Sequence, residues 1–132
     1  MYITIQTTYI INQSQIRLDI PKVIKICNLD DLKINKSCGF FVTMNGEKKP
    51  LIVVRLQNSV YVYINSCPHI GAPLDLKPGQ FLSHDKKNIV CSTHGALFEI
   101  ETGHCIFGPC KDKYLKAIPI QINNGEVLLT ST

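Results

Sequence analysis

Two short segments of this chain each place a cysteine close to a histidine and end in glycine. The first reads Cys67-Pro68-His69-Ile70-Gly71, and the second reads Cys91-Ser92-Thr93-His94-Gly95. A lone cysteine or histidine is usually a buried or solvated side chain, but two such pairs in one chain rarely arise by chance. We therefore predict that the fold brings the two segments together around a metal centre. The four predicted ligands are Cys67, His69, Cys91 and His94.

Two kinds of metal centre can be built from two thiolates and two imidazoles. A [2Fe–2S] cluster takes two sulfurs on one iron and two nitrogens on the other. A zinc ion accepts the same four groups in a tetrahedral shell. Mixed zinc sites more often combine C-x-x-C with H-x₃₋₅-H, a spacing that this sequence lacks. The pattern therefore favours iron–sulfur and leaves zinc as the alternative.

The residues around the ligand pairs resemble the two cluster-binding loops of Rieske-type proteins. The resemblance is carried by Cys67–Leu74 and by Cys91–Glu99, and Thr102–Pro109 is similar to the strand, turn and proline-bearing third loop that close over a Rieske cluster. Respiratory-type Rieske loops each carry a further cysteine, and these two form a disulfide. The matching positions here are Ala72 and Thr93, which moves the resemblance toward the ferredoxin-like branch.

The resemblance implies that the chain holds one [2Fe–2S] cluster. The inner iron would be bound by Cys67 and Cys91. The outer iron, near solvent, would be bound by His69 and His94. Backbone amides must approach the cluster sulfides closely, and the glycines in all three segments offer no Cβ that would obstruct this approach.

Runs of β-branched and aromatic residues predict a chain built almost entirely of strands. Turn signals such as Asn45-Gly46 and Asn123–Gly125 join neighbouring runs into hairpins, and a short turn at Asn28–Leu32 is the only helical signal. The resemblance implies an all-β Rieske fold, an antiparallel barrel or sandwich with a small inserted cluster-binding subdomain. The predicted strands cover residues 22–27, 40–43, 51–56, 60–64, 88–91, 97–100, 116–122 and 126–130.

We expect one compact domain, because 132 residues with 45% hydrophobic residues can bury a single core. Residues 1–20 are expected to form an N-terminal extension or an edge strand. Residues 21–132 are expected to form the Rieske domain, with its cluster-binding part at about 66–110.

Charge and hydropathy exclude two classes of partner. The net charge of +4 is spread over short turn-like segments, without the dense basic stripe that nucleic-acid binding needs. No run approaches the about 18 consecutive apolar residues of a membrane helix, and Met1–Thr8 has no basic start and is interrupted by polar residues, unlike a secretory signal. We therefore expect a soluble, cytoplasmic protein. Its remaining cysteines should be reduced thiols. They are Cys27, Cys38, Cys105 and Cys110.

The predicted function is electron transfer and not catalysis, because a [2Fe–2S] cluster moves one electron at a time. The sequence lacks a hydrolytic triad signature, a nucleotide loop and a second ligand set for mononuclear iron. We expect a Rieske-type ferredoxin, or a small electron-transfer component of an oxygenase or reductase system, whose partner is a reductase or an oxygenase. The alternatives are a zinc-stabilised interaction module and an iron–sulfur redox sensor.

The resemblance also predicts how the cluster is tuned and how it meets a partner. High-potential Rieske proteins carry hydroxyl donors at the positions of Ala96 and Phe98, so a potential near the low end of the range, about −150 mV, is expected here. A partner is expected to dock on an apolar rim formed by Ile70, Leu74 and the Gly108-Pro109 loop. The two histidines outside the ligand set are expected to be exposed turn residues. They are His84 and His104.

Overall fold

The computed structural model describes residues 2–5 and 23–130, and their regular elements are strands apart from one 3₁₀ turn, η1 (Leu29–Asp31). The strands are β1 (Tyr2–Ile5), β2 (Val23–Asn28), β3 (Lys36–Met44), β4 (Glu47–Leu56), β5 (Ser59–Ile64), β6 (Asn88–Val90), β7 (Leu97–Glu99), β8 (Cys105–Phe107), β9 (Ile120–Asn123) and β10 (Glu126–Thr130). No helix in these two ranges is long and apolar enough to cross a membrane.

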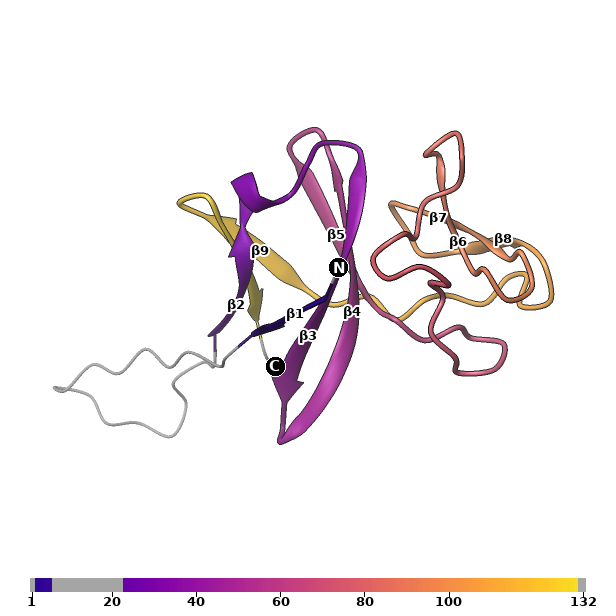
Figure 1. Cartoon of the computed structure of the whole chain (residues 1–132), viewed down its shortest axis with the longest axis horizontal. Coiled ribbons are helices and arrows are strands. Elements are labelled where there is room, and N and C mark those ends of the chain that lie inside the picture. The colour runs from indigo at the N-terminus through magenta and orange to yellow at the C-terminus, as the bar shows by residue number, and fades with distance from the viewer. Residues whose placement is uncertain (1, 6–22, 131–132) are drawn as a thin grey trace, which may run out of the picture.

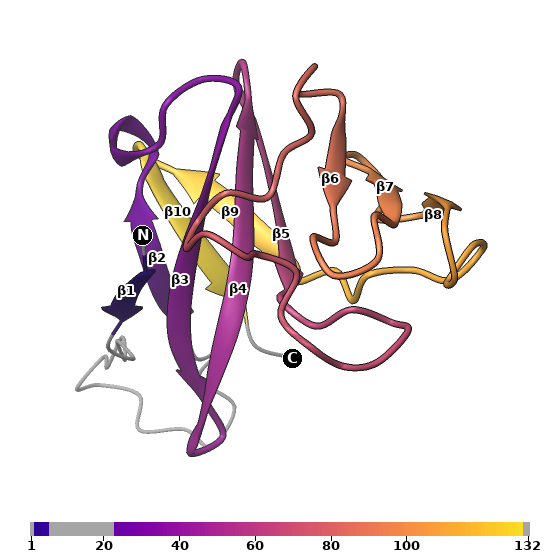
Figure 2. The ribbon, with the colours of Figure 1, turned by 45° about the vertical axis from the view of Figure 1, so that its right-hand side comes forward.

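The strands form three sheets (Figures 1 and 2). A four-stranded sheet has the order β1-β3-β4-β5, and a three-stranded sheet has the order β2-β10-β9. These two face each other as a sandwich, and the small sheet β6-β7-β8 lies to one side, beyond β4 and β5 (Figure 1). The predicted all-β fold with a small inserted subdomain is confirmed.

The hairpins form where the turn signals predict them. In the β3–β4 turn, Asn45 and Gly46 have φ values of 51° and 79°, and in the β9–β10 turn, Asn124 and Gly125 have values of 52° and 74°. Two successive positive φ angles are typical of the tight turn that matches the twist of paired strands. β1 adds a parallel edge strand beside β3, and the rest of the expected extension lies outside the described residues.

Three strands differ from the prediction by several residues. One is β4, which begins at Glu47 and not at Leu51. β3 begins at Lys36 and not at Phe40, because its first residues pair with the end of β4, where Lys36 lies opposite Arg55. The last strand but one is regular only from Ile120. Pro119 directly before it has no N–H to give to a neighbouring strand, so regular pairing begins after the proline.

One hydrophobic core, the sandwich core, fills the space between the two larger sheets. Alternate residues of each strand point into it, as expected for strands with one buried face. Its most deeply buried members include Phe40, Val42, Leu51, Val53, Val127 and Leu129.

β4 is buried on both faces. Leu51 and Val53 face the sandwich core, whereas Ile52 and Val54 face a second core beneath the small sheet. All four side chains are 0% exposed. The continuous apolar run in the sequence is explained by this double burial, since a strand with one wet face would alternate. β4 therefore separates the two cores and belongs to both.

The chain enters and leaves the small subdomain at one place. The Ile64 N–H donates to the Lys116 carbonyl at 2.9 Å, and the Ile118 N–H donates to the Val62 carbonyl at 2.9 Å. Between them Tyr63 and Ala117 form an antiparallel bridge. The end of β5 and residues 116–118 therefore form a two-stranded neck between the small subdomain and the sandwich.

Candidate metal centre

Two loops of the same backbone form carry the four predicted ligands. In the first loop the Cys67 N–H donates to the Ala72 carbonyl at 2.8 Å, and the Gly71 N–H donates to the Cys67 carbonyl at 2.7 Å. The second loop repeats these bonds at 2.9 and 2.8 Å, between Cys91, Ala96 and Gly95. Both glycines have positive φ, at 74° and 70°, a conformation that costs glycine little. The glycine after each ligand pair therefore closes its loop.

Polar contacts join the first loop to the second loop and to Asn65, the residue that follows β5. The Ser92 N–H donates to the Leu74 carbonyl at 2.9 Å. The side chain of Asn65 accepts from the Leu74 N–H at 2.7 Å and donates to the Asp75 carboxylate at 2.9 Å. Asn65 is 2% exposed. The sequence analysis did not predict its role, and the only signal for it is the position of Asn65 between an apolar strand and Cys67. This buried amide holds the first loop in place.

The structure brings the four predicted ligands together as two pairs. Cys67 and Cys91, 2% and 0% exposed, both lie in the second core, and the Cys91 thiol is near enough to raise the pKa of Cys67. His69 and His94 are exposed, and their ring centroids are 5.0 Å apart with 80° between the ring planes. Within residues 2–5 and 23–130, no three His, Cys, Asp or Glu side chains are grouped to hold a single metal ion. A buried thiol pair thus lies beneath an exposed imidazole pair.

Backbone amides point at the sulfur of Cys67. Burial is the main cause that raises the pKa of this thiol, and the neighbouring Cys91 thiol raises it further. The N–H groups of His69 and Ile70 donate to the sulfur and lower its pKa. Such donors stabilise the thiolate, which is the form that binds a metal.

A third loop follows β8 and touches the second loop. Gly108 has a φ of 108°, and a Cβ added to it would lie 2.8 Å from Cα of Ala96. The loop is closed by backbone bonds from Asp112 to Cys105 at 2.9 Å and from Cys105 to Lys113 at 2.8 Å. Glycine is required at position 108 because two backbones meet there.

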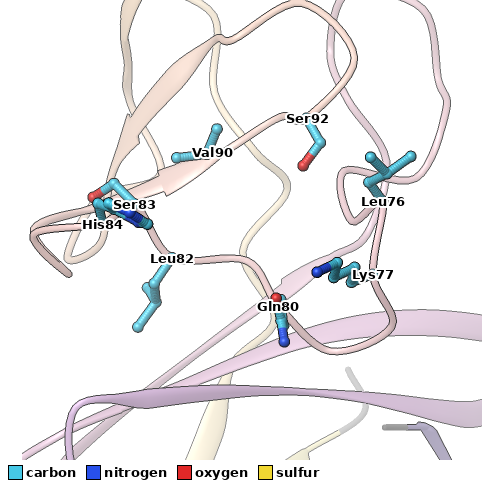
Figure 3. A pocket seen from close by; sticks show the side chains of 8 residues that line it. All are labelled: Leu76, Lys77, Gln80, Leu82, Ser83, His84, Val90 and Ser92. Carbon is cyan, nitrogen blue, oxygen red and sulfur yellow. The ribbon is translucent and has the colours of Figure 1, made fainter.

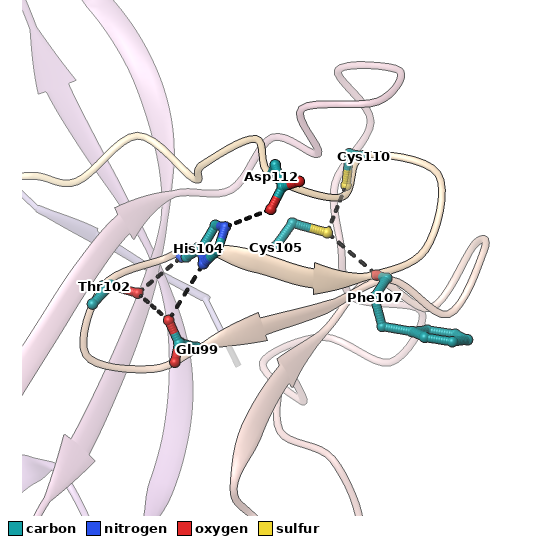
Figure 4. Close-up of polar contacts among 7 residues, drawn as sticks. All are labelled: Glu99, Thr102, His104, Cys105, Phe107, Cys110 and Asp112. Carbon is teal, nitrogen blue, oxygen red and sulfur yellow. Dashed lines mark hydrogen bonds and ion pairs between the residues drawn. The ribbon is translucent and has the colours of Figure 1, made fainter.

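Two further cysteines, Cys105 and Cys110, belong to the same core as Cys67 and Cys91 and contact each other (Figure 4). The Cys110 thiol donates to Sγ of Cys105 at 3.2 Å. The Cys105 thiol donates to the Phe107 carbonyl at 3.2 Å. Burial first, and then the thiols of Cys105 and Cys67, raise the pKa of Cys110 to about 12. All six cysteines are free thiols, as predicted for those outside the ligand set.

The predicted apolar rim is wrong in one member. Leu74 is 0% exposed and belongs to the second core, because its backbone is held by the side chain of Asn65. Exposed apolar side chains beside the loops include Ile70, 51% exposed, and Phe107, 62% exposed. The rim therefore includes the tip of the first loop and the end of β8, and Pro109 of the predicted third loop is exposed as well.

The prediction for His104 is also wrong, because this side chain is half-buried in a network of contacts (Figure 4). Its ring stacks on Tyr114 with centroids 4.8 Å apart. Nε2 lies 3.1 Å from the Asp112 carboxylate, and Nδ1 lies 3.6 Å from that of Glu99. His104 thus ties the third loop to the β7–β8 hairpin.

His84 is exposed as predicted, and it borders a surface cavity of about 410 Å³ (Figure 3). Of the two cluster loops, only the second reaches this cavity, through Ser92. The remaining lining residues are Leu76, Lys77, Gln80, Leu82, Ser83 and Val90. None of the four predicted ligands therefore lines this cavity.

The family model of the Rieske [2Fe-2S] domain matches residues 22–123 of this chain. The chain therefore belongs to the Rieske [2Fe–2S] domain family. Its cofactor is one [2Fe–2S] cluster, and the predicted resemblance is confirmed.

Solved structures of ferredoxins share the fold and more than a quarter of the sequence. The ferredoxin of carbazole 1,9a-dioxygenase from Nocardioides aromaticivorans IC177 is 28% identical, with 83% of this chain and 95% of that chain covered and a TM-score of 0.64. The Sphingomonas yanoikuyae B1 ferredoxin is 26% identical, with 82% of this chain and 97% of that chain covered and a TM-score of 0.64. A chain in the complex of reduced oxygenase and oxidized ferredoxin in carbazole 1,9a-dioxygenase is 26% identical. The match covers 81% of this chain and 91% of that chain, with a TM-score of 0.64. No curated protein matches the chain at a significant level.

Proposed function

We propose that this chain is an electron carrier, the ferredoxin of an oxygenase or reductase system. The observation that carries the proposal is the buried thiol pair beneath an exposed imidazole pair on a Rieske domain. The inner iron would be held by Cys67 and Cys91. The outer iron would be held by His69 and His94. When bound, the cluster accepts and releases one electron at a time.

The chain's own residues would bind, insulate and present this centre. The thiol pair lies in the second core, where fully buried side chains such as Leu74 and Phe98 exclude water. The amides of His69 and Ile70 support negative charge on the Cys67 sulfur. The imidazole pair lies at the surface, where a redox partner can approach closely.

The comparisons support a protein partner and not a small-molecule substrate. The matches span 95% and 97% of the two ferredoxins, and the third matched structure is a ferredoxin–oxygenase complex. We therefore assign the chain a non-catalytic role with a reductase and an oxygenase as its redox partners. We also propose a cytoplasmic location, because the four free thiols outside the ligand set suit a reducing compartment.

Within the chain, we propose that residues 21–132 form the Rieske domain and that the cluster-binding part covers about 66–110. The neck supports this division, because the chain enters and leaves the small subdomain there. Residues 1–20 would be an extension, from which Tyr2–Ile5 adds an edge strand.

Metal analysis and electron paramagnetic resonance of the full chain, expressed with ample iron, test the proposal. We expect about two irons and two sulfides per chain and, after reduction with dithionite, the resonance of a reduced [2Fe–2S] centre with mixed sulfur and nitrogen ligands. Stoichiometric zinc without iron would contradict the proposal and favour the interaction module.

A partner is expected to dock on Ile70 and Phe107, because these exposed apolar side chains flank the loops that carry the imidazoles. Ile70→Asp and Phe107→Asp should each slow electron transfer to the oxygenase by about tenfold, the effect of losing a contact worth about 1.4 kcal/mol. The rate is measured by stopped-flow absorbance. The cluster spectrum should not change.

Ile122→Asp is the matched control, because Ile122 is 41% exposed on β9, in the sheet that lies away from the small subdomain. It should transfer electrons at the wild-type rate. Equal rates in all three variants would show that the partner binds elsewhere.

A further inference from the structure

A groove with basic walls lies on the surface beside the second cluster loop. It consists of two adjoining surface cavities, of about 410 and about 300 Å³. The first cavity reaches Ser92 of the second cluster loop, and the second cavity reaches Lys36 at the start of β3. We name the two cavities together the basic groove. Both are bordered by the same four residues, which are Gln80, Leu82, Ser83 and His84.

The lining of the basic groove carries positive charge without a negative counterpart. Lys77 borders the first cavity, and Lys36 and Lys86 border the second. All three lysines are exposed. Among the described residues, no aspartate or glutamate lines either cavity. A ligand with negative charges is therefore the kind that this surface attracts.

The walls of the basic groove are held by hydrogen bonds within the chain. Asp75 accepts from the Gly79 N–H at 3.1 Å, and Asp85 accepts from the Ser83 hydroxyl at 2.6 Å. The Ser37 hydroxyl on β3 donates to the Gly79 carbonyl at 2.8 Å, which ties this segment to the sandwich. The groove is therefore formed before a ligand arrives, which reduces the cost of ordering it on binding.

An exposed apolar side chain restricts the kind of ligand further. Leu76 borders the first cavity and is 83% exposed. In Figure 3, Leu76 and Lys77 lie across the cavity from Ser83 and His84. A small inorganic anion would contact a lysine and leave Leu76 in water, whereas a peptide segment with an apolar residue next to acidic ones would cover both. The surface therefore fits an acidic peptide segment.

We propose, resting on the electron-transfer function above, that the basic groove binds an acidic segment of the redox partner, whose carboxylates contact the three lysines and whose apolar side chain covers Leu76. The groove reaches Ser92, in the same loop as His94, so a partner bound there lies beside the exposed imidazoles. Complementary charges on two surfaces speed their encounter and fix their orientation. The groove thus orients the partner toward the imidazole pair.

Calorimetric titration of a short peptide into the iron-loaded full chain tests this inference. The probe is a six-residue peptide that alternates glutamate with leucine, and it should bind. Lys77→Glu should weaken its binding at least fivefold, the loss of an exposed ion pair worth about 1 kcal/mol. Leu76→Ser should also weaken it by about fivefold, because covering part of a leucine contributes a similar free energy.

Lys48→Glu is the matched control, because Lys48 is an exposed lysine at the start of β4, outside the basic groove. It makes the same change in net charge and should bind the peptide as the wild type does. Equal weakening by Lys48→Glu and Lys77→Glu would show only a general attraction to a basic protein and would overturn the inference. Wild-type binding by Leu76→Ser, with inorganic polyphosphate bound more tightly than the peptide, would also overturn it, because the groove would then be a phosphate site.

The remaining outcomes separate this inference from the function on which it rests. In the stopped-flow measurement described above, Lys77→Glu should slow electron transfer to the oxygenase about fivefold at low ionic strength, where charges are least screened. An iron-loaded chain that binds no peptide and transfers electrons at the wild-type rate as Lys77→Glu overturns the inference alone. A chain that binds zinc and no iron contradicts the electron carrier and its redox partner, even when the peptide binds.

Discussion

Cys67→Ser is expected to give a colourless protein that binds no iron, and His94→Ala is expected to do the same. Each variant removes one of the four side chains that the two loops bring together. A serine hydroxyl does not supply the thiolate that the iron needs, and alanine leaves one iron position open. Binding and local folding are coupled, so both loops should also lose stability. Absorbance, iron content and the melting temperature measure these effects.

Matched controls exist for both substitutions. Cys38→Ser makes the same chemical change at a partly buried cysteine that packs against the sandwich core, and His84→Ala removes an exposed histidine outside the ligand set. Both controls should keep full iron content. Retention of the cluster by Cys67→Ser and His94→Ala would show that other residues hold the metal.

Gly108→Ala is expected to cause the second large effect, a loss of about 2–4 kcal/mol in the free energy of unfolding. The new Cβ would lie 2.8 Å from Cα of Ala96, and backbone atoms cannot turn aside as a flexible side chain can. The φ of 108° adds strain for any residue with a Cβ. Small domains are stable by only about 5–15 kcal/mol, so this loss is a considerable fraction of the total. Urea denaturation of the loaded protein measures it.

Gly125→Ala is the control that separates the strain of a positive φ from the steric contact that a Cβ at position 108 would make with Ala96. Gly125 has a φ of 74°, and nothing lies within 4 Å of the position that a Cβ would take. This variant should lose only the about 1–2 kcal/mol that a left-handed conformation costs. Equal losses at both positions would mean that the third loop moves freely away from Ala96 and that the contact is unimportant.

The features that the sequence predicts correctly have local signals. Cys67 and His69, like Cys91 and His94, are neighbours along the chain, and each loop is closed by its own glycine. Hairpins such as the one at Asn45-Gly46 need only two residues to specify the turn. Spacing and turn chemistry are therefore enough to predict the loops and the strands that support them.

The features that the sequence does not predict depend on contacts between distant segments. Leu74 looks like an exposed loop residue until the side chain of Asn65 fixes its backbone and the second core covers it. The close approach of Gly108 to the backbone of Ala96 joins two loops that are separate along the chain. Local sequence periodicity does not predict such contacts between distant segments, because they form only when the small sheet packs on β4.

The two-stranded neck limits how the centre can reach its partners. A domain held by one flexible linker can swing between a donor and an acceptor while it stays attached to both. Here two hydrogen-bonded connections and the shared strand β4 join the small subdomain to the sandwich, so such a swing would break backbone bonds and open both cores. Donor and acceptor must then use the same exposed face in turn. The speed of electron delivery is consequently limited by how fast the protein leaves one partner, which favours small, short-lived interfaces over tight ones.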